Sequence, residues 1–409
     1  MISSQEIDQC MKSADWRERL RCAERRDFTP TPEQASRGLN DTSKRVREAW
    51  SERMDWTPTP EQVEKGLTDK SSDIRLSWAK RTDIHPSLEQ IERGLTDEDP
   101  RVRVTWIQRK DSSPSPEQIS RGLMDTSPWV RLTWTERMDW TPTPEQIERG
   151  LQDDMPRERG EWVKRMDWTP TPEQIERGLQ DRDKLVRKAW AERMDWTPSP
   201  EQVERGLTDV SSWVRAAWAR RMDFIPTPEQ IERGLTDEEI GVKISWAHRT
   251  DFTPTPEQIK RGLTDKGYIV RQAWAQRMDF TPTPEQIEKG LTDSEYSVRI
   301  IWASRMDYTP TPEQIERGLT DKVAEVREAW AKRTDYKATL EQIERGIIDA
   351  RVNVVLAWLE RKDIEWTQEQ IQLGLTHEDD MIRSYWEKIV KKRNSEYSSY
   401  SDSMPFMSI

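Results

Sequence analysis

A spacing of 28 residues organises almost the whole chain. Asp recurs at this interval from Asp27 to Asp363 without insertion or deletion, and Trp recurs at the same interval from Trp50 to Trp386. A fixed period of this length indicates a repeat architecture in which every unit has the same geometry. We therefore predict an all-α fold, an α-solenoid of about 14 tandem 28-residue helix-turn-helix repeats that forms an elongated, curved or superhelical rod.

Each repeat carries start and stop signals for two short helices. Thr59 is expected to cap a first helix, Pro60 to fill its first position and Gln62 to complete a capping box. Gly66 is expected to end that helix in a left-handed conformation, and Asp69 to cap a second helix. The Thr-Pro pairs that follow disfavour helix, so a stiff linker joins one repeat to the next.

The recurring Trp residues are the predicted core. In the second helix of one repeat, Ile74, Ser77 and Trp78 share one face, and the helix ends near Arg81, whose charge suits a helix C-terminus. A unit this short buries too little apolar surface to offset its own conformational entropy. Stacking of neighbours must supply the stability, and we expect the Trp rings to form one continuous core.

The ends of the chain depart from the repeat. Residues 1–26 read as a degenerate first repeat, in which Cys10 and Cys22 replace the usual Gly and Trp, and residues 363–391 read as a degenerate last one. We predict a solenoid domain over residues 1–391 and a flexible Ser/Tyr-rich tail over 392–409. Two Cys cannot make a disulfide framework or a closed zinc site, which favours reduced thiols and a cytoplasmic location.

The second helix carries a motif seen in known solenoids. Asp209, Val214, Arg215 and Ala219 give the pattern D-x4-VR-x3-A, which resembles HEAT-like repeats and the variant leucine-rich repeat. The resemblance implies a helical solenoid in which each Arg bonds carbonyl groups or the Asp of the adjacent repeat.

The sequence offers little for catalysis or for nucleic-acid binding. The three His residues, His85, His248 and His377, occupy different positions of distant repeats, and no Gly-rich phosphate loop or HExxH motif occurs. The formal net charge of −11 is spread over all repeats and opposes phosphate. An aromatic series from Phe28 to Tyr336 is therefore expected to cover helix starts rather than to stack on bases. We predict no enzyme activity, cofactor, metal or membrane span, and direct nucleic-acid binding is not expected.

One repeat breaks the pattern. Glu158 takes the place of the usual Val, Gly160 lies inside the second helix, and Glu161 replaces a small residue. Gly in a helix interior costs about 1 kcal/mol. A local kink or a widened groove is expected there.

The positions that vary between repeats are the candidate binding site. They fall three and four residues apart on the second helix, away from the Trp, and form one ridge. Its apolar members are the predicted partner-binding residues: Trp129, Leu185, Trp213, Ile240, Tyr268, Ile269 and Tyr296. A constant frame with such a variable ridge is typical of a scaffold that binds a protein partner. Two alternatives stay open: an acidic decoy that inhibits a nucleic-acid-binding protein, and a structural or self-assembling spacer.

Overall fold

The computed structural model describes residues 4–111 and 113–401, with side chains for residues 5–111 and 113–391. The regular elements within these ranges are 28 helices, which make tandem pairs and confirm the all-α solenoid prediction. The helices fall into an N-terminal unit, Met1–Trp196, and a C-terminal unit, Thr197–Ile409.

The N-terminal unit contains the first fourteen helices. They are α1 Ser4–Cys10, α2 Trp16–Glu24, α3 Pro32–Leu39, α4 Lys44–Ser51, α5 Pro60–Leu67, α6 Ser72–Ala79, α7 Leu88–Leu95, α8 Pro100–Gln108, α9 Pro116–Gly122, α10 Pro128–Glu136, α11 Pro144–Gly150, α12 Pro156–Lys164, α13 Pro172–Leu179 and α14 Lys184–Glu192.

The C-terminal unit contains the other fourteen. They are α15 Pro200–Leu207, α16 Ser212–Arg220, α17 Pro228–Leu235, α18 Ile240–Ala247, α19 Pro256–Leu263, α20 Tyr268–Ala275, α21 Pro284–Leu291, α22 Tyr296–Ser304, α23 Pro312–Leu319, α24 Ala324–Ala331, α25 Leu340–Ile347, α26 Val352–Leu359, α27 Gln368–Leu375 and α28 Asp380–Ser401.

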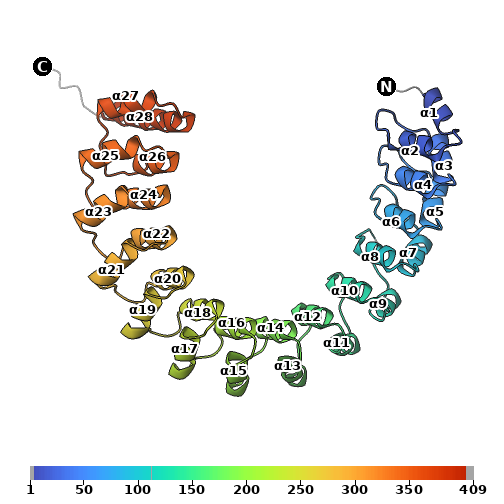
Figure 1. Ribbon diagram of the computed structural model, residues 1–409, viewed down its shortest axis with the longest axis horizontal. Helices are drawn as coiled ribbons and strands as arrows, with labels where there is room; N and C mark the ends of the chain where they lie inside the picture. The colour runs from blue at the N-terminus through green and yellow to red at the C-terminus, as the bar shows by residue number, and fades with distance from the viewer. Residues whose placement is uncertain (1–3, 112, 402–409) are drawn as a thin grey trace. The chain divides into compact units, whose positions relative to one another are not determined.

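Within each unit the helices form two layers (Figure 1). Odd-numbered helices are the first helices of their repeats, and even-numbered helices are the second helices. Each second helix packs against the first helix of its own repeat and against the second helix of the next repeat in the same unit. The closest packing therefore runs along the layer of second helices.

The first helices begin as the sequence predicts. Thr59 accepts a hydrogen bond from the Gln62 N–H, and the Gln62 side chain accepts one from the Thr59 N–H at 2.8 Å. The same capping box opens every first helix from α3 to α27. Because the cap satisfies N–H groups that the helix leaves free, short helices of seven or eight residues start at a defined position.

Two details of the predicted helix ends are wrong. Gly66 lies within α5, which ends at Leu67, and no glycine of the described chain has a positive φ. Its role is close approach: a Cβ at Gly66 would overlap the indole of Trp78. Asp69 is not the cap of the second helix, which starts after Ser71; the Asp69 carboxylate instead accepts the Ser71 N–H at 2.9 Å, in the turn before the helix.

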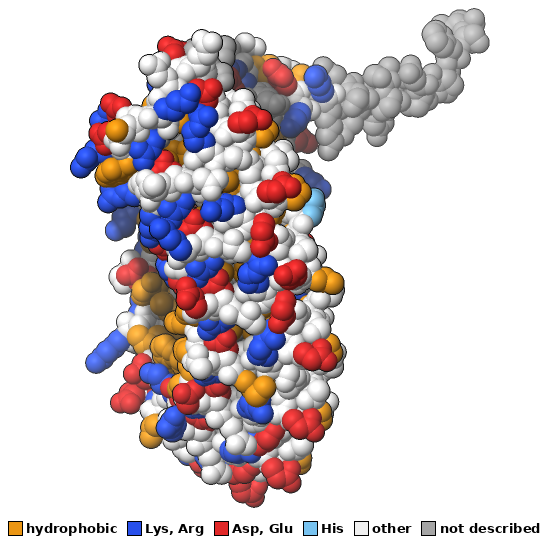
Figure 2. All heavy atoms as spheres, turned by 90° about the vertical axis from the view of Figure 1, so that its right-hand side faces the viewer, with side chains coloured by type: hydrophobic (Ala, Val, Ile, Leu, Met, Phe, Trp, Pro, Cys, Tyr) orange, Lys and Arg blue, Asp and Glu red, His pale blue; other side chains and the backbone are white. Residues whose placement is uncertain are grey.

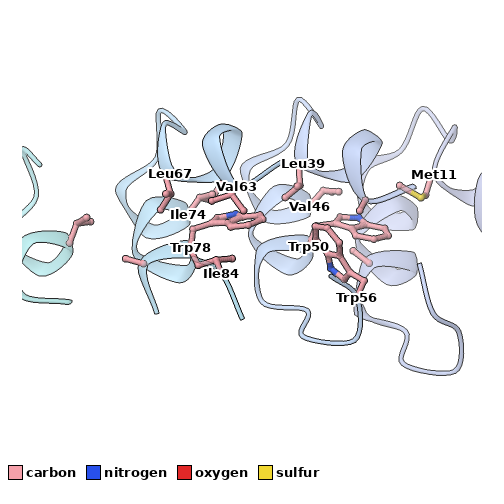
Figure 3. Close-up of a cluster of buried hydrophobic side chains, with 14 of the residues drawn as sticks. Met11, Leu39, Val46, Trp50, Trp56, Val63, Leu67, Ile74, Trp78 and Ile84 are labelled. Atoms are coloured by element: carbon pink, nitrogen blue, oxygen red, sulfur yellow. The ribbon is translucent and has the colours of Figure 1, made fainter. Parts of the chain in front are cut away.

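The predicted tryptophan core is confirmed. Each of the thirteen Trp residues of the 28-residue series is at most 3% exposed. Figure 3 shows Trp50 and Trp78 between successive helices, with Val46 and Ile74 beside them. Burial of about 200 Å² per ring at ~25 cal/mol per Å² gives on the order of 5 kcal/mol of hydrophobic stabilisation per repeat.

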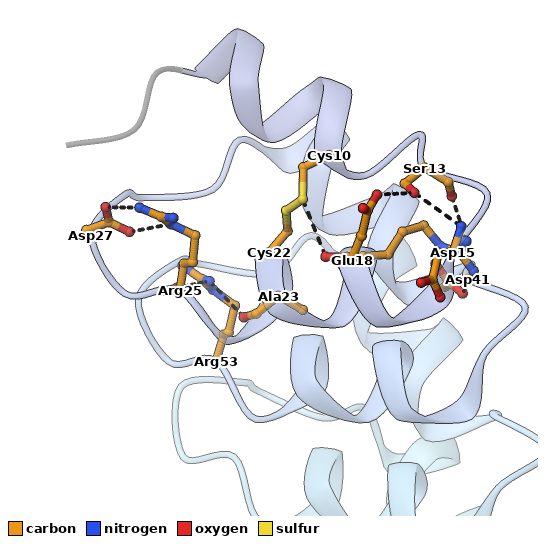
Figure 4. The surroundings of a disulfide bond; sticks show 11 residues. Cys10, Ser13, Asp15, Glu18, Cys22, Ala23, Arg25, Asp27, Asp41 and Arg53 are labelled. Atoms are coloured by element: carbon orange, nitrogen blue, oxygen red, sulfur yellow. Dashed lines mark hydrogen bonds and ion pairs between the residues drawn. A yellow bond between two sulfur atoms is a disulfide. The ribbon is translucent and has the colours of Figure 1, made fainter.

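The first repeat replaces this packing with a covalent bond. Cys10, at the end of α1, and Cys22, within α2, form a disulfide, and their Cα atoms lie 6.4 Å apart (Figure 4). The two positions correspond to Gly38 and Trp50 of the next repeat, where a glycine instead contacts the indole. The expectation of reduced thiols is therefore wrong for this structure. The disulfide joins the two helices that the Trp joins elsewhere.

The last helix is longer than the others. α28 runs without a break from Asp380 to Ser401, 22 residues, whereas the other second helices have eight or nine. The flexible tail predicted for residues 392–409 stays a prediction. Its helical part ends at Ser401, and residues 402–409 lie outside the described part of the chain.

Candidate partner-binding surface

A ladder of ion pairs joins successive second helices. In α16, Arg215 donates from Nε and Nη2 to the two carboxylate oxygens of Asp237 at 2.7 and 2.8 Å, and from Nη1 to the Asp209 carbonyl at 2.9 Å. Burial would raise the pKa of Asp237, but the bonds from Arg215 outweigh it and hold that pKa below its ordinary value. The same pairing recurs in both units, with Lys243 in place of Arg once. The Asp–Arg motif is thus a structural ladder, as the HEAT resemblance implies.

A second arginine ladder crosses the repeat boundary in the opposite direction. Arg193, 3% exposed, donates to the carbonyls of Val163 and Arg165 at 2.8 and 2.9 Å, and from Nε to Asp195 at 2.7 Å. Those carbonyls belong to the C-terminal end of α12, in the preceding repeat. From the sequence, such an arginine, Arg81, is expected to interact with the C-terminus of its own helix. It instead donates to the Ser51 carbonyl, at the C-terminus of α4 in the preceding repeat. Equivalent bonds are made by Arg109, Arg165, Arg249, Arg277, Arg305 and Arg333.

The second aromatic series packs against these arginines. The Arg193 guanidinium lies 4.1 Å from the ring centroid of Trp168, whose indole meets that of Trp190 edge-on at 6.3 Å. Phe224, Phe252 and Tyr308 likewise contact the guanidinium groups of Arg249, Arg277 and Arg333. These rings are occupied by structural contacts, as expected, and do not form an open platform for bases.

The ladders are interrupted toward the two ends of the chain. After the Arg327–Asp349 pair, the next two positions of the first ladder hold Val355 in place of Arg and His377 in place of Asp. Both partners of that pair are therefore replaced. Ile389 replaces the next arginine of the second ladder, and Ser13 stands where the first acceptor Asp would be. The terminal repeats therefore lack several of the charged groups that connect internal ones.

The irregular repeat contains a buried carboxyl. Glu158 is 1% exposed and lies 3.1 Å from Nε of Arg131. Burial, followed by the charge of Asp153, raises the pKa of Glu158 to about 8. The predicted kink does not interrupt α12, which has nine residues like α10 and α14. A Cβ at Gly160 would meet no atom within 4 Å, so nothing in the packing requires glycine there.

The variable ridge lies at the start of the second helices. All seven predicted residues occupy the first or second position of their helix and are between 42% and 55% exposed. The N-terminal unit contributes Trp129 and Leu185, and the C-terminal unit contributes Trp213, Ile240, Tyr268, Ile269 and Tyr296. Large apolar side chains are thus presented to solvent at recurring positions.

The ridge of the N-terminal unit has a charged surrounding. The Arg157 guanidinium lies 5.4 Å from the centroid of the Trp129 ring. Both side chains line a surface cavity of about 350 Å³ between α8 and α10, together with Arg101, Leu132 and Glu136. Arg101 is already paired with Asp73 and Asp99, at 3.0 and 2.7 Å.

Sequence reasoning missed a further set of exposed apolar side chains. A methionine follows the second-ladder arginine in seven repeats, and each is about half exposed or more: Met54, Met138, Met166, Met194, Met222, Met278 and Met306. The constant R-M-D triplet was the available signal. These residues lie just past the ends of the second helices, opposite to the ridge.

Charge on the surface is mixed. Figure 2 shows acidic and basic side chains interspersed over one face of the molecule, with hydrophobic side chains in small groups. Many charged side chains are paired between repeats, whichever face they lie on: Glu148, for example, accepts bonds from Arg177 and Gln174 at 2.9 and 3.1 Å.

In residues 4–111 and 113–401, no group of three or more His, Cys, Asp or Glu side chains is arranged to hold a metal ion. No helix in those ranges combines the length and the apolar character needed to cross a membrane.

Comparison with known proteins agrees with the repeat geometry. A family model described as a HEAT repeat associated with sister chromatid cohesion matches residues 88–105, which cover α7 and the first part of α8. The described helices form an α-solenoid, and its repeats resemble HEAT repeats. No curated protein matches it.

Several solved structures are similar to the chain. One, described as a leucine-rich repeat variant with a novel repetitive motif, has a TM-score of 0.41 and 22% identity over 58% of this chain and 88% of its own. A structure of importin beta has a TM-score of 0.31 and 12% identity, and the match covers 94% of this chain and 56% of importin beta. A structure of microtubule polymerases with TOG domain arrays has a TM-score of 0.25 and 11% identity, and the match covers 94% of this chain and 99% of that one. Since these TM-scores are below 0.5, the fold described above stands on the helices and contacts of this chain alone.

Proposed function

We propose that this chain is a non-enzymatic repeat scaffold that binds a protein partner through the variable ridge of its second helices. The observation that carries the proposal is the exposure of all seven ridge residues, at 42–55%, in a chain whose thirteen Trp residues of the 28-residue series are at most 3% exposed. Exposed aromatic and branched side chains at recurring positions are typical of interface hot spots.

The surrounding scaffold supports this proposal. Many of the charged groups that recur from repeat to repeat are bonded in the two ladders and in the pairs between first helices. The ridge residues, in contrast, differ from repeat to repeat. A cytoplasmic location remains a prediction, and the Cys10–Cys22 disulfide is an argument against a strictly reducing environment.

The test compares two variants of the full chain as bait in a lysate. In the ridge variant, Trp213, Tyr268 and Tyr296 are replaced by Ala. In the matched control, Met222, Met278 and Met306, which are exposed just past the ends of the same three helices, are replaced by Ala. A partner retained by wild type and control, but lost from the ridge variant, supports the proposal.

The alternatives give other results. An acidic decoy would bind its partners through exposed charges, which ions screen, so the partners would dissociate at high salt. They would bind both variants as well as they bind wild type. A structural spacer would hold no partner in any form. Loss of the partner from the methionine control alone would move the binding site to the other ends of the helices and contradict the proposal.

A further inference from the structure

Three successive second helices of the C-terminal unit present no free charge. α18, α20 and α22 contain no acidic residue, in a chain in which 34% of residues are charged. Each has one basic residue, Lys243, Arg271 or Arg299, and each of these is bonded to an Asp of the next repeat at 2.7 or 2.8 Å. The ladder thus uses every charge that these helices have.

The exposed side chains of the same helices form an apolar row. It consists of Ile240, Tyr268, Ile269 and Tyr296, which are 42–48% exposed. The row ends at the next repeat, where α24 has Glu325 at the position of Ile269. Three consecutive repeats therefore share a property that the following repeat lacks.

The turns before these helices are mainly acidic. Glu238 and Glu239 precede α18, and Glu295 precedes α22, against a single base, Lys266, before α20. Glu239 and Glu295 occupy the N-cap positions, yet neither makes a side-chain capping bond. Their carboxylates are thus not engaged in capping, and the apolar row has a negative edge on one side.

Building on the proposed function, we propose that the apolar row binds an amphipathic helix of the partner whose apolar stripe is flanked by basic residues. Adjacent packed helices are about 8–10 Å apart, which matches the ~10.5 Å that seven residues span in an α-helix. A helix with one apolar residue per heptad can therefore place one on each of the three repeats. An extended strand covers the same step in about three residues, and successive contacts would then point to opposite sides.

The negative edge selects the charge of the flank. Lys or Arg beside the stripe meets Glu238, Glu239 and Glu295, whereas Glu at the same places is repelled. The uncharged row itself disfavours a charged contact face, because a charge buried there would lose its hydration without gaining a partner.

The test uses a fluorescein-labelled three-heptad peptide with Leu at the first and fourth positions of each heptad and Lys beside them. Two matched peptides exchange all Lys for Glu, or all Leu for Gln. Binding to the full chain is followed by fluorescence anisotropy at physiological ionic strength. We expect the Leu/Lys peptide to bind, and each matched peptide to bind at least about tenfold more weakly, since a change of ~1.4 kcal/mol is tenfold in affinity.

Point variants locate the site. Ile269→Glu is expected to weaken binding about tenfold or more, and the variant should fold because α24 carries Glu at this position. The matched control Ala324→Glu, at the first position of α24, should leave affinity unchanged. Glu239→Gln combined with Glu295→Gln should weaken the Leu/Lys peptide and strengthen the Leu/Glu peptide.

Specified outcomes would overturn the inference. Equal binding of the Gln/Lys and Leu/Lys peptides, or equal effects of Ile269→Glu and Ala324→Glu, would show general attraction of a basic peptide to an acidic chain. Absence of peptide binding, together with a lysate partner that still requires the ridge, would refute the helical occupant and leave the scaffold function standing. If no peptide binds and the lysate partner also binds the ridge variant, both the helical occupant and the proposed scaffold function are refuted.

Discussion

Replacement of Glu158 by valine should stabilise the N-terminal unit, and the gain should grow with pH. The carboxyl has an ordinary pKa of 4.5 and a folded pKa of about 8. Below pH 4.5 it is protonated in both the folded and the unfolded chain and costs nothing. Between the two values the unfolded chain releases the proton while the folded chain retains it, so the free energy of unfolding falls as pH rises.

The magnitude follows from the separation of the two pKa values. Each pH unit within that interval costs about 1.36 kcal/mol, which gives about 3 kcal/mol at pH 7 and about 5 kcal/mol above pH 8. Valine removes the titrating group and restores the residue found at this position in the neighbouring repeats, as at Val130 and Val186. Arg131 keeps its two bonds to Asp153 at 2.8 Å, so the substitution leaves it paired.

Native-state hydrogen exchange of the α12 amides at pH 5 and pH 7.5 measures the effect where it arises. The opening free energy of wild type should fall relative to that of Glu158→Val by about 3 kcal/mol between the two pH values. Glu158→Gln, which keeps the shape and does not titrate, should follow the valine variant in its pH course. If the opening free energy changes equally with pH in wild type and in both variants, the reasoning is refuted.

Other predictions concern single contacts of the scaffold, each checked by thermal or urea denaturation. Gly178→Ala should destabilise by about 2 kcal/mol or more, because the new methyl overlaps a buried indole, whereas Gly160→Ala should stabilise by about 1 kcal/mol; effects of equal sign would contradict the packing argument. Arg193→Ala should cost about 2–3 kcal/mol by leaving two buried carbonyls of the preceding repeat without their donor, and a loss below ~1 kcal/mol would count against the second ladder. Reduction of the disulfide, or Cys10→Ser with Cys22→Ser, should cost up to about 3 kcal/mol and increase exchange mainly in α1 and α2; unchanged exchange there would show that packing alone holds the first repeat.

Local signals made the fold predictable. A Thr or Ser before each first helix from α3 to α27, with Gln three residues later, specifies a capping box through local bonds, and a Trp every 28 residues specifies the buried face. The glycine of each repeat was misassigned because its constraint is not local. Gly66 is small to admit Trp78, a contact between two helices that a capping rule does not consider.

The candidate site was predictable in its residues but not in its surroundings. Variation between repeats identified Tyr268 and Ile269, since exposed positions tolerate change. That Arg271 is withdrawn from the surface by a bond to Asp293 depends on a residue 22 positions away, in the next repeat. The uncharged character of the apolar row emerges only when such distant pairs are known.

The length of the last helix changes which carbonyl groups are available at its end. Many second helices end where an arginine of the next repeat reaches their final carbonyls, but α28 continues through the corresponding positions to Ser401, and its carbonyls there are used within the helix. At the other end, Ser13 offers no carboxylate to an incoming arginine. The two kinds of bond that join internal repeats are therefore not offered by the last turns of α28 or by Ser13.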